Sequence, residues 1–203
     1  CDKPCIVNWE AVRFKNSSAA TSPEMANAFE QCILERGIEG TSFQHIAQVL
    51  GMDRKMVSHY FGNREALVDA MTEQIVEGFD LRISEALASL ESSVSVMELV
   101  DAFYEQTNAS EHTDILWTEI CAYATRSETV RDRLRQSYNK MFQVVGEALE
   151  REYPHVSQEQ AQTAAYAIAT LLDRSPTFEW IGVKGEPMEL ARVAIKQVLE
   201  KLE

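Results

Sequence analysis

One stripe of apolar side chains constrains the fold of this chain more than any other feature. Large apolar residues recur every four positions over about six helical turns, at Leu67, Met71, Ile75, Phe79, Ile83 and Leu87. An α-helix places residues that are four apart on the same face, so these side chains form one continuous apolar surface. A long helix with one apolar side buries that side against other helices.

Helical periodicity continues through most of the chain from Ser22 onward. Ser22 suits an N-cap before Pro23, and Gly37 suits the end of that first helix. Thr41 and Gln44 suit a capping box at the start of the second helix, and Asp53 and Asn63 suit N-caps of the third and fourth helices. We expect helices over residues 22–37, 41–51, 53–61, 63–91, 95–108, 112–125, 127–151, 157–181 and 187–202. No segment shows the sustained alternation of a strand, so the sequence predicts an all-α fold with about nine helices.

The charge of the chain is strongly acidic, but the acidity is unevenly distributed. The 203 residues carry a net charge of −13. Residues 1–62 hold one more acid than base, and the remainder holds twelve more. A protein that binds polyanions over its whole surface would be basic. Any nucleic-acid contact must therefore lie on a small face, which we place in the near-neutral first third.

Cysteine use and hydropathy favour a cytoplasmic protein. The four cysteines, at positions 1, 5, 32 and 121, are too few and too scattered for a disulfide scaffold. Cys1 and Cys5 have no further ligand nearby to complete a metal site, so we expect neither a metal nor a cofactor. No apolar run is long enough for a membrane span, and the first residues do not resemble a signal peptide.

Residues 41–67 have the spacing of a helix-turn-helix. Ala47 supplies a small side chain where two short helices cross. Gly51, four residues later, suits a tight turn that needs positive φ. Val57, six residues after Gly51, is an apolar anchor that faces back from the second helix. In such a unit the second helix enters the major groove of DNA.

The second helix of this unit would present a polar, cationic face. Arg54, Lys55, Ser58 and His59 fall on one arc of about 140°, with Met56 at its edge. Arginine and lysine bind guanine or phosphate, serine binds either, and methionine can touch a thymine methyl. The spacing alone does not separate this interpretation from an ordinary amphipathic helix whose charges are solvated.

The wider pattern of residues 33–71, ILERGIEGTSFQHIAQVLGMDRKMVSHYFGNREALVDAM, resembles the DNA-binding region of TetR-family transcriptional regulators. The elements that carry the resemblance are Glu35-Arg36-Gly37, Thr41-Ser42, Ile46-Ala47, Gly51-Met52-Asp53, Ser58-His59-Tyr60-Phe61 and Arg64-Glu65-Ala66-Leu67. Ser58 stands where the family usually has tyrosine, Tyr60 where it has histidine and Arg64 where it has lysine. The residues that we expect to contact DNA are Thr41, Ser42, Gln44, Arg54, Lys55, Met56, Ser58, His59, Tyr60 and Arg64.

The resemblance also implies the organisation of the chain. We expect a flexible N-terminal extension at residues 1–20, a helix-turn-helix domain at 21–66 and an effector-binding and dimerisation domain at 67–203. Residues 115–142 and 167–183 are weakly similar to the BetI-type branch of the family, which responds to choline or betaine. There Asp173-Arg174-Ser175-Pro176 replaces the usual D-G-L.

The family's dimer would form through the last two helices, about 157–181 and 187–202. Small and larger apolar residues suit that pairing, or else a core within one chain: Ala161, Ala164, Ala165, Tyr166, Ala167, Ile168, Ala169, Leu171 and Leu172 in the first, and Leu190, Val193, Ala194, Val198 and Leu202 in the second. The candidates to line an effector pocket are Phe103, Tyr104, Trp117, Cys121, Tyr123, Tyr138, Phe142 and Phe178, although aromatic residues at helical spacing are usually core.

The function that we expect is that of a homodimeric regulator of transcription. It would repress by binding a palindromic DNA operator and would be released by an unidentified small-molecule effector. The competing hypothesis is a protein-interaction module whose helix-turn-helix no longer binds DNA; steep salt dependence distinguishes the DNA binder. We expect no enzyme, because no phosphate loop, nucleophile elbow or H-E-x-x-H motif is present.

Overall fold

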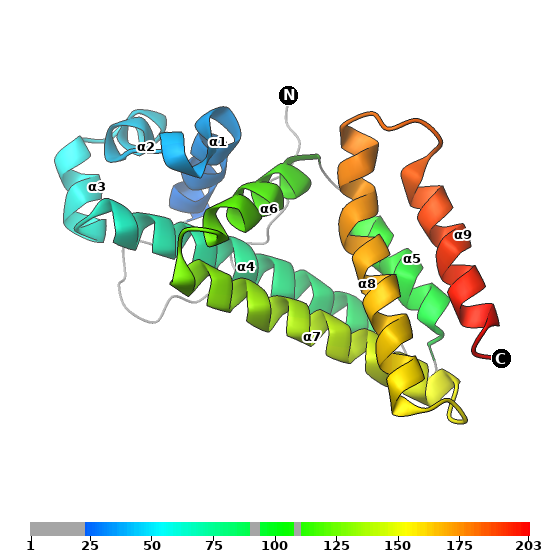
Figure 1. Ribbon diagram of the computed structural model, residues 1–203. Coiled ribbons are helices and arrows are strands. Elements are labelled where there is room, and N and C mark those ends of the chain that lie inside the picture. The colour runs from blue at the N-terminus through cyan, green and yellow to red at the C-terminus, as the bar shows by residue number, and fades with distance from the viewer. Residues whose placement is uncertain (1–22, 90–93, 108–110) are drawn as a thin grey trace. The chain divides into compact units, whose positions relative to one another are not determined.

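The computed structural model describes residues 23–89, 94–107 and 111–203, which form helices joined by short connections (Figure 1). The expected extension at 1–20, with Cys1 and Cys5, and the expected cap at Ser22 lie outside these ranges. Nine helices occupy the described ranges: α1 (Pro23–Gly40), α2 (Phe43–Leu50), α3 (Arg54–Phe61), α4 (Arg64–Ser89), α5 (Val96–Thr107), α6 (Glu111–Ala124), α7 (Glu128–Glu152), α8 (Gln158–Trp180) and α9 (Pro187–Glu200). The predicted all-α class is confirmed. No helix among these residues is long and apolar enough to cross a membrane.

Side-chain caps begin several helices where the sequence predicts them. The Asp53 carboxylate accepts the Lys55 N–H at 2.7 Å before α3. The Asn63 side chain accepts the Ala66 N–H at 2.8 Å before α4. Such caps satisfy backbone donors that the first turn of a helix leaves without a partner, and each stabilises its helix by about 1 kcal/mol.

The junction between α1 and α2 differs in part from the prediction. Gly37 breaks the helix with φ 67° and ψ 171°, as expected, but one further turn follows it. Thr41 is buried, and its hydroxyl donates to the Gly37 carbonyl at 2.9 Å. The cap of α2 is instead Ser42, whose side chain accepts the His45 N–H. The capping box expected from Thr41 and Gln44 is therefore not formed, because the threonine side chain faces the core.

The chain divides into two compact units. One contains the described residues up to Leu81 together with Ile115–Leu134, and the other contains Arg82–Asp114 and Arg135–Glu203 where they are described. The chain passes between the units within α4, α6 and α7.

The first unit is built around α4. Leu67, Met71 and Ile75 of its apolar stripe are buried, and the Phe79 ring stacks on Trp117 of α6 with 4.4 Å between ring centroids. The side chains of the expected stripe residues Ile83 and Leu87 lie outside the described set. The helix therefore buries the face that its four-residue spacing defines, at least as far as Phe79.

The second unit has its core between α5, α7, α8 and α9. Val100, Leu149, Ile168 and Ile195, one from each helix, are almost completely buried there. The alanines at 161, 164 and 165 also belong to this core, as does Leu202, and Ala169 is buried as well. The sequence suited these residues either to a dimer or to a core within one chain, and the buried alanines let α8 pack closely within its own chain. Helix α8 continues through Pro176, which is buried.

Candidate DNA-binding interface

The turn between α2 and α3 has the geometry that the sequence spacing predicts. Gly51 adopts a left-handed conformation, with φ 64° and ψ 28°, which favours glycine because it has no Cβ. The Met52 N–H then donates to the Ala47 carbonyl at 3.0 Å. Ala47 and Val57 are both buried, so the two helices meet over a small residue and an apolar anchor. This arrangement fixes the direction of α3 relative to α2.

Helix α3 has one buried face and one exposed face. Val57 and Phe61 are buried, and the Phe61 ring meets Phe29 of α1 edge-on, with 5.4 Å between ring centroids. The opposite side, which we call the recognition face, consists of Arg54, Lys55, Met56, Ser58 and His59. Arg54, Lys55, Met56 and His59 are exposed, and Ser58 is half-buried. Met56 is 47% exposed, although apolar side chains elsewhere in this unit are largely covered.

The two cations of the recognition face have no partner in the described part of the chain. Neither Arg54 nor Lys55 forms an ion pair there; Asp53 accepts only the backbone N–H of Lys55. The chain as a whole has a net charge of −13, and Arg54 and Lys55 place two exposed cations on one helical turn. Their charge is therefore available to an external anion.

The other residues expected to contact DNA fall into two groups. Ser42 and Gln44 are exposed at the start of α2, and Tyr60 is half-buried beside His59, with 6.0 Å between their rings. Thr41 and Arg64 are already engaged within the chain. The buried Thr41 hydroxyl is not available to a phosphate, and Arg64 donates to the carbonyls of Ile38 and Glu39 and to the Glu39 carboxylate.

Contacts that sequence reasoning missed surround the end of α1. Glu119 of α6 accepts the Ile38 N–H at 3.0 Å, although 81 positions separate the two residues. The Glu39 carboxylate lies 3.2 Å from both Arg64 and Arg126. No local pattern marks these side chains, because their partners are distant in the sequence.

A second missed contact joins α1 to α2. The Glu35 carboxylate lies 3.0 Å from Nε2 of the buried His45 and accepts a hydrogen bond from Gln31 at 2.9 Å. These hydrogen bonds, from Gln31 and then His45, hold the pKa of Glu35 below its ordinary value. The ionised form of Glu35 is therefore favoured in the folded helix-turn-helix.

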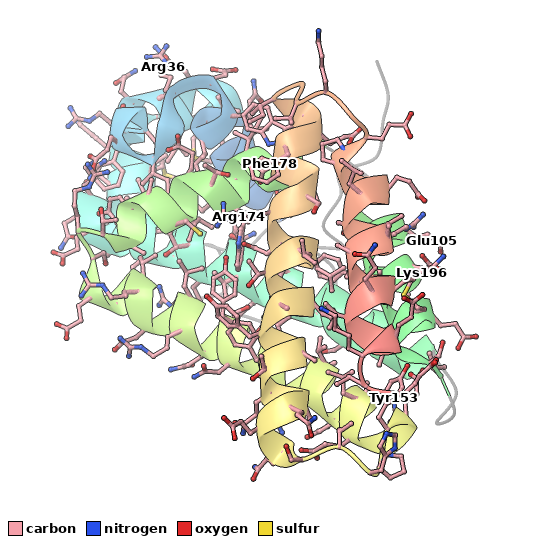
Figure 2. All side chains as sticks on the ribbon, turned by 45° about the vertical axis from the view of Figure 1, so that its right-hand side comes forward. Arg36, Glu105, Tyr153, Arg174, Phe178 and Lys196 are labelled. Atoms are coloured by element: carbon pink, nitrogen blue, oxygen red, sulfur yellow. The ribbon has the colours of Figure 1, made fainter. Side chains whose placement is uncertain are left out.

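The eight expected effector-contacting residues divide between the two units. Trp117, Cys121 and Tyr123 belong to the first unit, and the other five belong to the second. Tyr104 is buried beneath the Arg192 guanidinium, 5.2 Å from its ring centroid, and burial raises the pKa of its hydroxyl. Like Trp117, it has the contacts of a core residue. Phe178, in contrast, is 46% exposed on α8 (Figure 2).

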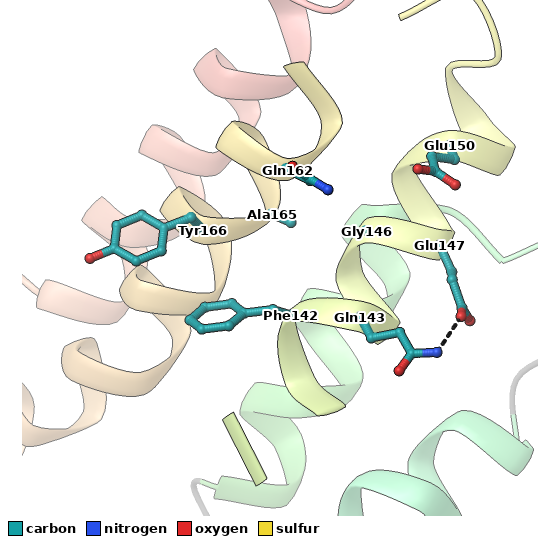
Figure 3. Close-up of a pocket in the computed structure, with 8 residues that line it drawn as sticks. All are labelled: Phe142, Gln143, Gly146, Glu147, Glu150, Gln162, Ala165 and Tyr166. Carbon is teal, nitrogen blue, oxygen red and sulfur yellow. Dashed lines mark hydrogen bonds between the residues drawn. The ribbon is translucent and has the colours of Figure 1, made fainter. Parts of the chain in front are cut away.

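One groove in the second unit carries an expected effector residue. It lies between α7 and α8, has a volume of about 460 Å³, and includes the rings of Phe142 and Tyr166 with 5.7 Å between their centroids (Figure 3). Glu147 and Glu150 add carboxylates along the α7 side. Glu147 accepts a hydrogen bond from Gln143 at 2.8 Å. The groove therefore combines apolar and acidic walls.

The α2–α3 turn and the recognition face define a helix-turn-helix DNA-binding protein with an additional helical region. Comparison with known proteins agrees. Residues 27–71 match the family described as bacterial regulatory proteins, tetR family. The curated HTH-type transcriptional regulators BetI of Vibrio campbellii and Cronobacter sakazakii are 21% and 23% identical to it. The alignments cover 88% of this chain, and 90% and 88% of the relatives.

Solved structures share the fold over most of the chain. A transcriptional regulator of Saccharomonospora viridis in complex with choline has a TM-score of 0.71 at 16% identity, covering 87% of this chain and 94% of that one. Reduced Escherichia coli NemR has a TM-score of 0.69 at 22% identity, covering 86% and 94%. Residues 27–71 therefore match the TetR family of transcriptional regulators, and most of the chain shares the fold of solved transcriptional regulators.

The lowered pKa of Glu35 predicts how acid affects the helix-turn-helix. A carboxyl whose pKa is lower in the folded state stabilises that state above its unfolded pKa, and the contribution is lost as pH falls through the folded pKa. We expect Glu35→Ala to lower the melting temperature at pH 7, and the difference from wild type to shrink below about pH 4.5. Thermal unfolding followed by circular dichroism at several pH values measures this difference. A difference that stays constant down to pH 3 would contradict the assigned hydrogen bonds.

Proposed function

We propose that this regulator binds a palindromic DNA operator as a homodimer and releases it when a small-molecule effector binds. The observation that carries DNA recognition is the recognition face of α3, with Arg54 and Lys55 exposed and unpaired in an acidic chain. Residues 21–66 would form the DNA-binding domain, and 67–203 the effector-binding and dimerisation domain. Arg54, Lys55, Met56 and Ser58 would reach base edges or phosphates in the major groove.

The remaining contacts would position the domain on the phosphate backbone. Ser42 and Gln44 are exposed at the start of α2, where backbone N–H groups favour an anion. His59, Tyr60 and the exposed part of Arg64 would add contacts beside α3. Thr41 drops out of this set, because its hydroxyl is buried and donates within the chain.

The DNA interface is tested by removing the two free cations. A sequence selected by wild-type protein from random duplex DNA serves as the probe, and fluorescence anisotropy measures affinity at two salt concentrations. Each base or phosphate contact contributes about 1–3 kcal/mol, so Arg54→Ala with Lys55→Ala should weaken binding by about a hundredfold or more. It should also flatten the salt dependence, because fewer counterions are released.

The matched control for this variant is Arg151→Ala with Lys201→Ala. It removes two exposed cations from α7 and from the residue that follows α9, so net charge changes equally. We expect wild-type affinity. Equal loss in both variants would mean that net charge, not the recognition face, governs binding. If wild-type protein enriches no sequence at either salt concentration, the hypothesis of DNA binding is rejected in favour of the protein-interaction module.

A homodimer is supported by the apolar surface of α8, α9 and the loop between them. Among the described residues eight large hydrophobic side chains are exposed, and all but Met56 lie between positions 166 and 193. They are Tyr166, Phe178, Trp180, Ile181, Val183, Leu190 and Val193, with exposures from 38% to 64%. Exposed large apolar side chains that are concentrated in one part of the chain favour an interaction surface there. A second copy is the partner that a two-fold operator requires.

The dimer surface is tested by Leu190→Glu with Val193→Glu. Burying two carboxylates without partners is strongly unfavourable, so we expect dissociation to monomers and loss of tight operator binding. Sedimentation equilibrium gives the mass. Gln136→Glu with Asn139→Glu is the control, because it adds two carboxylates three positions apart on an exposed part of α7. If only the control variant remains a dimer, α9 is supported as part of the interface. If both variants remain dimers, that assignment is contradicted.

The main support for a small-molecule effector is the ligand of a structurally similar protein. One structural neighbour was solved in complex with choline, and aromatic rings beside carboxylates can bind a quaternary ammonium group. The candidate residues remain Phe103, Tyr104, Trp117, Cys121, Tyr123, Tyr138, Phe142 and Phe178. An effector changes DNA binding only if its affinity differs between the bound and released conformations.

Choline is therefore the first compound to test for release. We expect millimolar choline chloride to lower the anisotropy of the labelled operator complex more than sodium chloride at equal ionic strength. Equal effects of the two salts would exclude choline as the effector, and the operator would then serve to screen other small molecules.

A further inference from the structure

The break at Gly37 leaves the next residue with an unsatisfied backbone donor, and α6 supplies the acceptor. Gly37 leaves the helical conformation, and the Ile38 N–H donates to Oε2 of Glu119 at 3.0 Å. Ile38 is 1% exposed, so this donor lies away from water. A carboxylate that accepts a buried N–H forms a strong, charge-assisted hydrogen bond.

The glycine is matched to this carboxylate in two ways. Its φ of 67° is one that side-chain-bearing residues rarely adopt. A Cβ placed on Gly37 would lie 2.8 Å from Oε2 of Glu119, which is closer than real Cβ contacts allow. The absence of a side chain therefore permits both the break and the approach of Glu119.

Two further contacts hold the same short segment. The Glu39 carboxylate lies 3.2 Å from Arg126, which follows α6, and 3.2 Å from Arg64 of α4. Arg64 also donates to the Ile38 carbonyl at 3.0 Å. The three side chains of these ion pairs are between 43% and 59% exposed, so solvent weakens the pairs. The bond from Ile38 to Glu119 is the more shielded link.

We propose that Glu119 is a positioning residue that fixes the α1–α2 junction and thereby the direction of α3. The inference rests on the proposed function, because the consequence of that direction is the spacing of two recognition helices on DNA. Residues 38–41 lead directly into the Ser42 cap of α2, and the α2–α3 turn is itself fixed at Gly51. A shift of Glu119 would therefore reach α3 through a continuous hydrogen-bonded path.

The test uses the operator selected by wild-type protein and versions in which the half-sites are one or two base pairs further apart. Wild type should prefer the selected spacing. We expect Glu119→Ala to bind the operator of that spacing about tenfold more weakly. This factor corresponds to the free energy of one charge-assisted hydrogen bond. Its discrimination between spacings should shrink, while its affinity for random duplex stays within about twofold.

Two additional substitutions separate positioning from general stability. Glu119→Gln keeps an acceptor oxygen and should restore most of the spacing preference. Glu119→Asp keeps the charge but shortens the side chain by one methylene, so it should behave like Glu119→Ala. Amide hydrogen exchange of Ile38 should accelerate in the alanine and aspartate variants only. Glu105→Ala, which removes an exposed carboxylate from α5, is the matched control and should behave like wild type.

The outcomes that overturn the inference are distinct from failure of the proposed function. If wild type selects an operator and Glu119→Asp keeps wild-type spacing preference, Glu119 does not position α3. If affinities for operator and random duplex fall in parallel with melting temperature, its role is only structural and the inference is again wrong. If wild type itself selects no sequence, the proposed function fails and this inference fails with it.

Discussion

The packing of α2 against α3 is the interaction on which the DNA-binding face depends. Each helix has only eight residues, and isolated helices of that length are unstable in water. They persist because Ile46, Ala47 and Val57 bury their side chains in a shared core. Gly51 makes this possible by turning the chain through a left-handed conformation. The contacts that the buried side of α3 makes therefore determine which of its residues are exposed.

Charge distribution explains how an acidic protein can bind DNA. Net charge −13 opposes nonspecific binding to a polyanion, so only a local surface can attract it. In the proposed function Arg54 and Lys55 would provide that surface, because they are exposed and have no ion pair among the described residues. Arg64 shows the contrasting arrangement, since its guanidinium already holds the end of α1. An interface with few cations relies on correct placement more than on total charge.

The sequence predicts helices well where local signals dominate and fails where burial decides. The caps at Asp53 and Asn63, the break at Gly37 and the turn at Gly51 depend on neighbours in the chain, and each lies where expected. Thr41 is of a residue type that commonly caps helices, but the fold buries its side chain. The candidate DNA-contacting set could thus be named from the sequence, although its contacts with DNA stay predictions. The Glu119 contact could not be named, because 81 positions separate it from Ile38.

The proposed DNA binding requires the recognition face of α3 to lie in the major groove. Dimethyl sulfate interference on a selected operator tests it most directly, because the reagent methylates guanine N7, which is exposed in that groove. We expect methylation at guanines in two symmetric half-sites to block wild-type binding. Arg54→Ala with Lys55→Ala should remove the sensitivity of those guanines in the residual complexes. Interference that is absent, or unchanged in this variant, would contradict the claim.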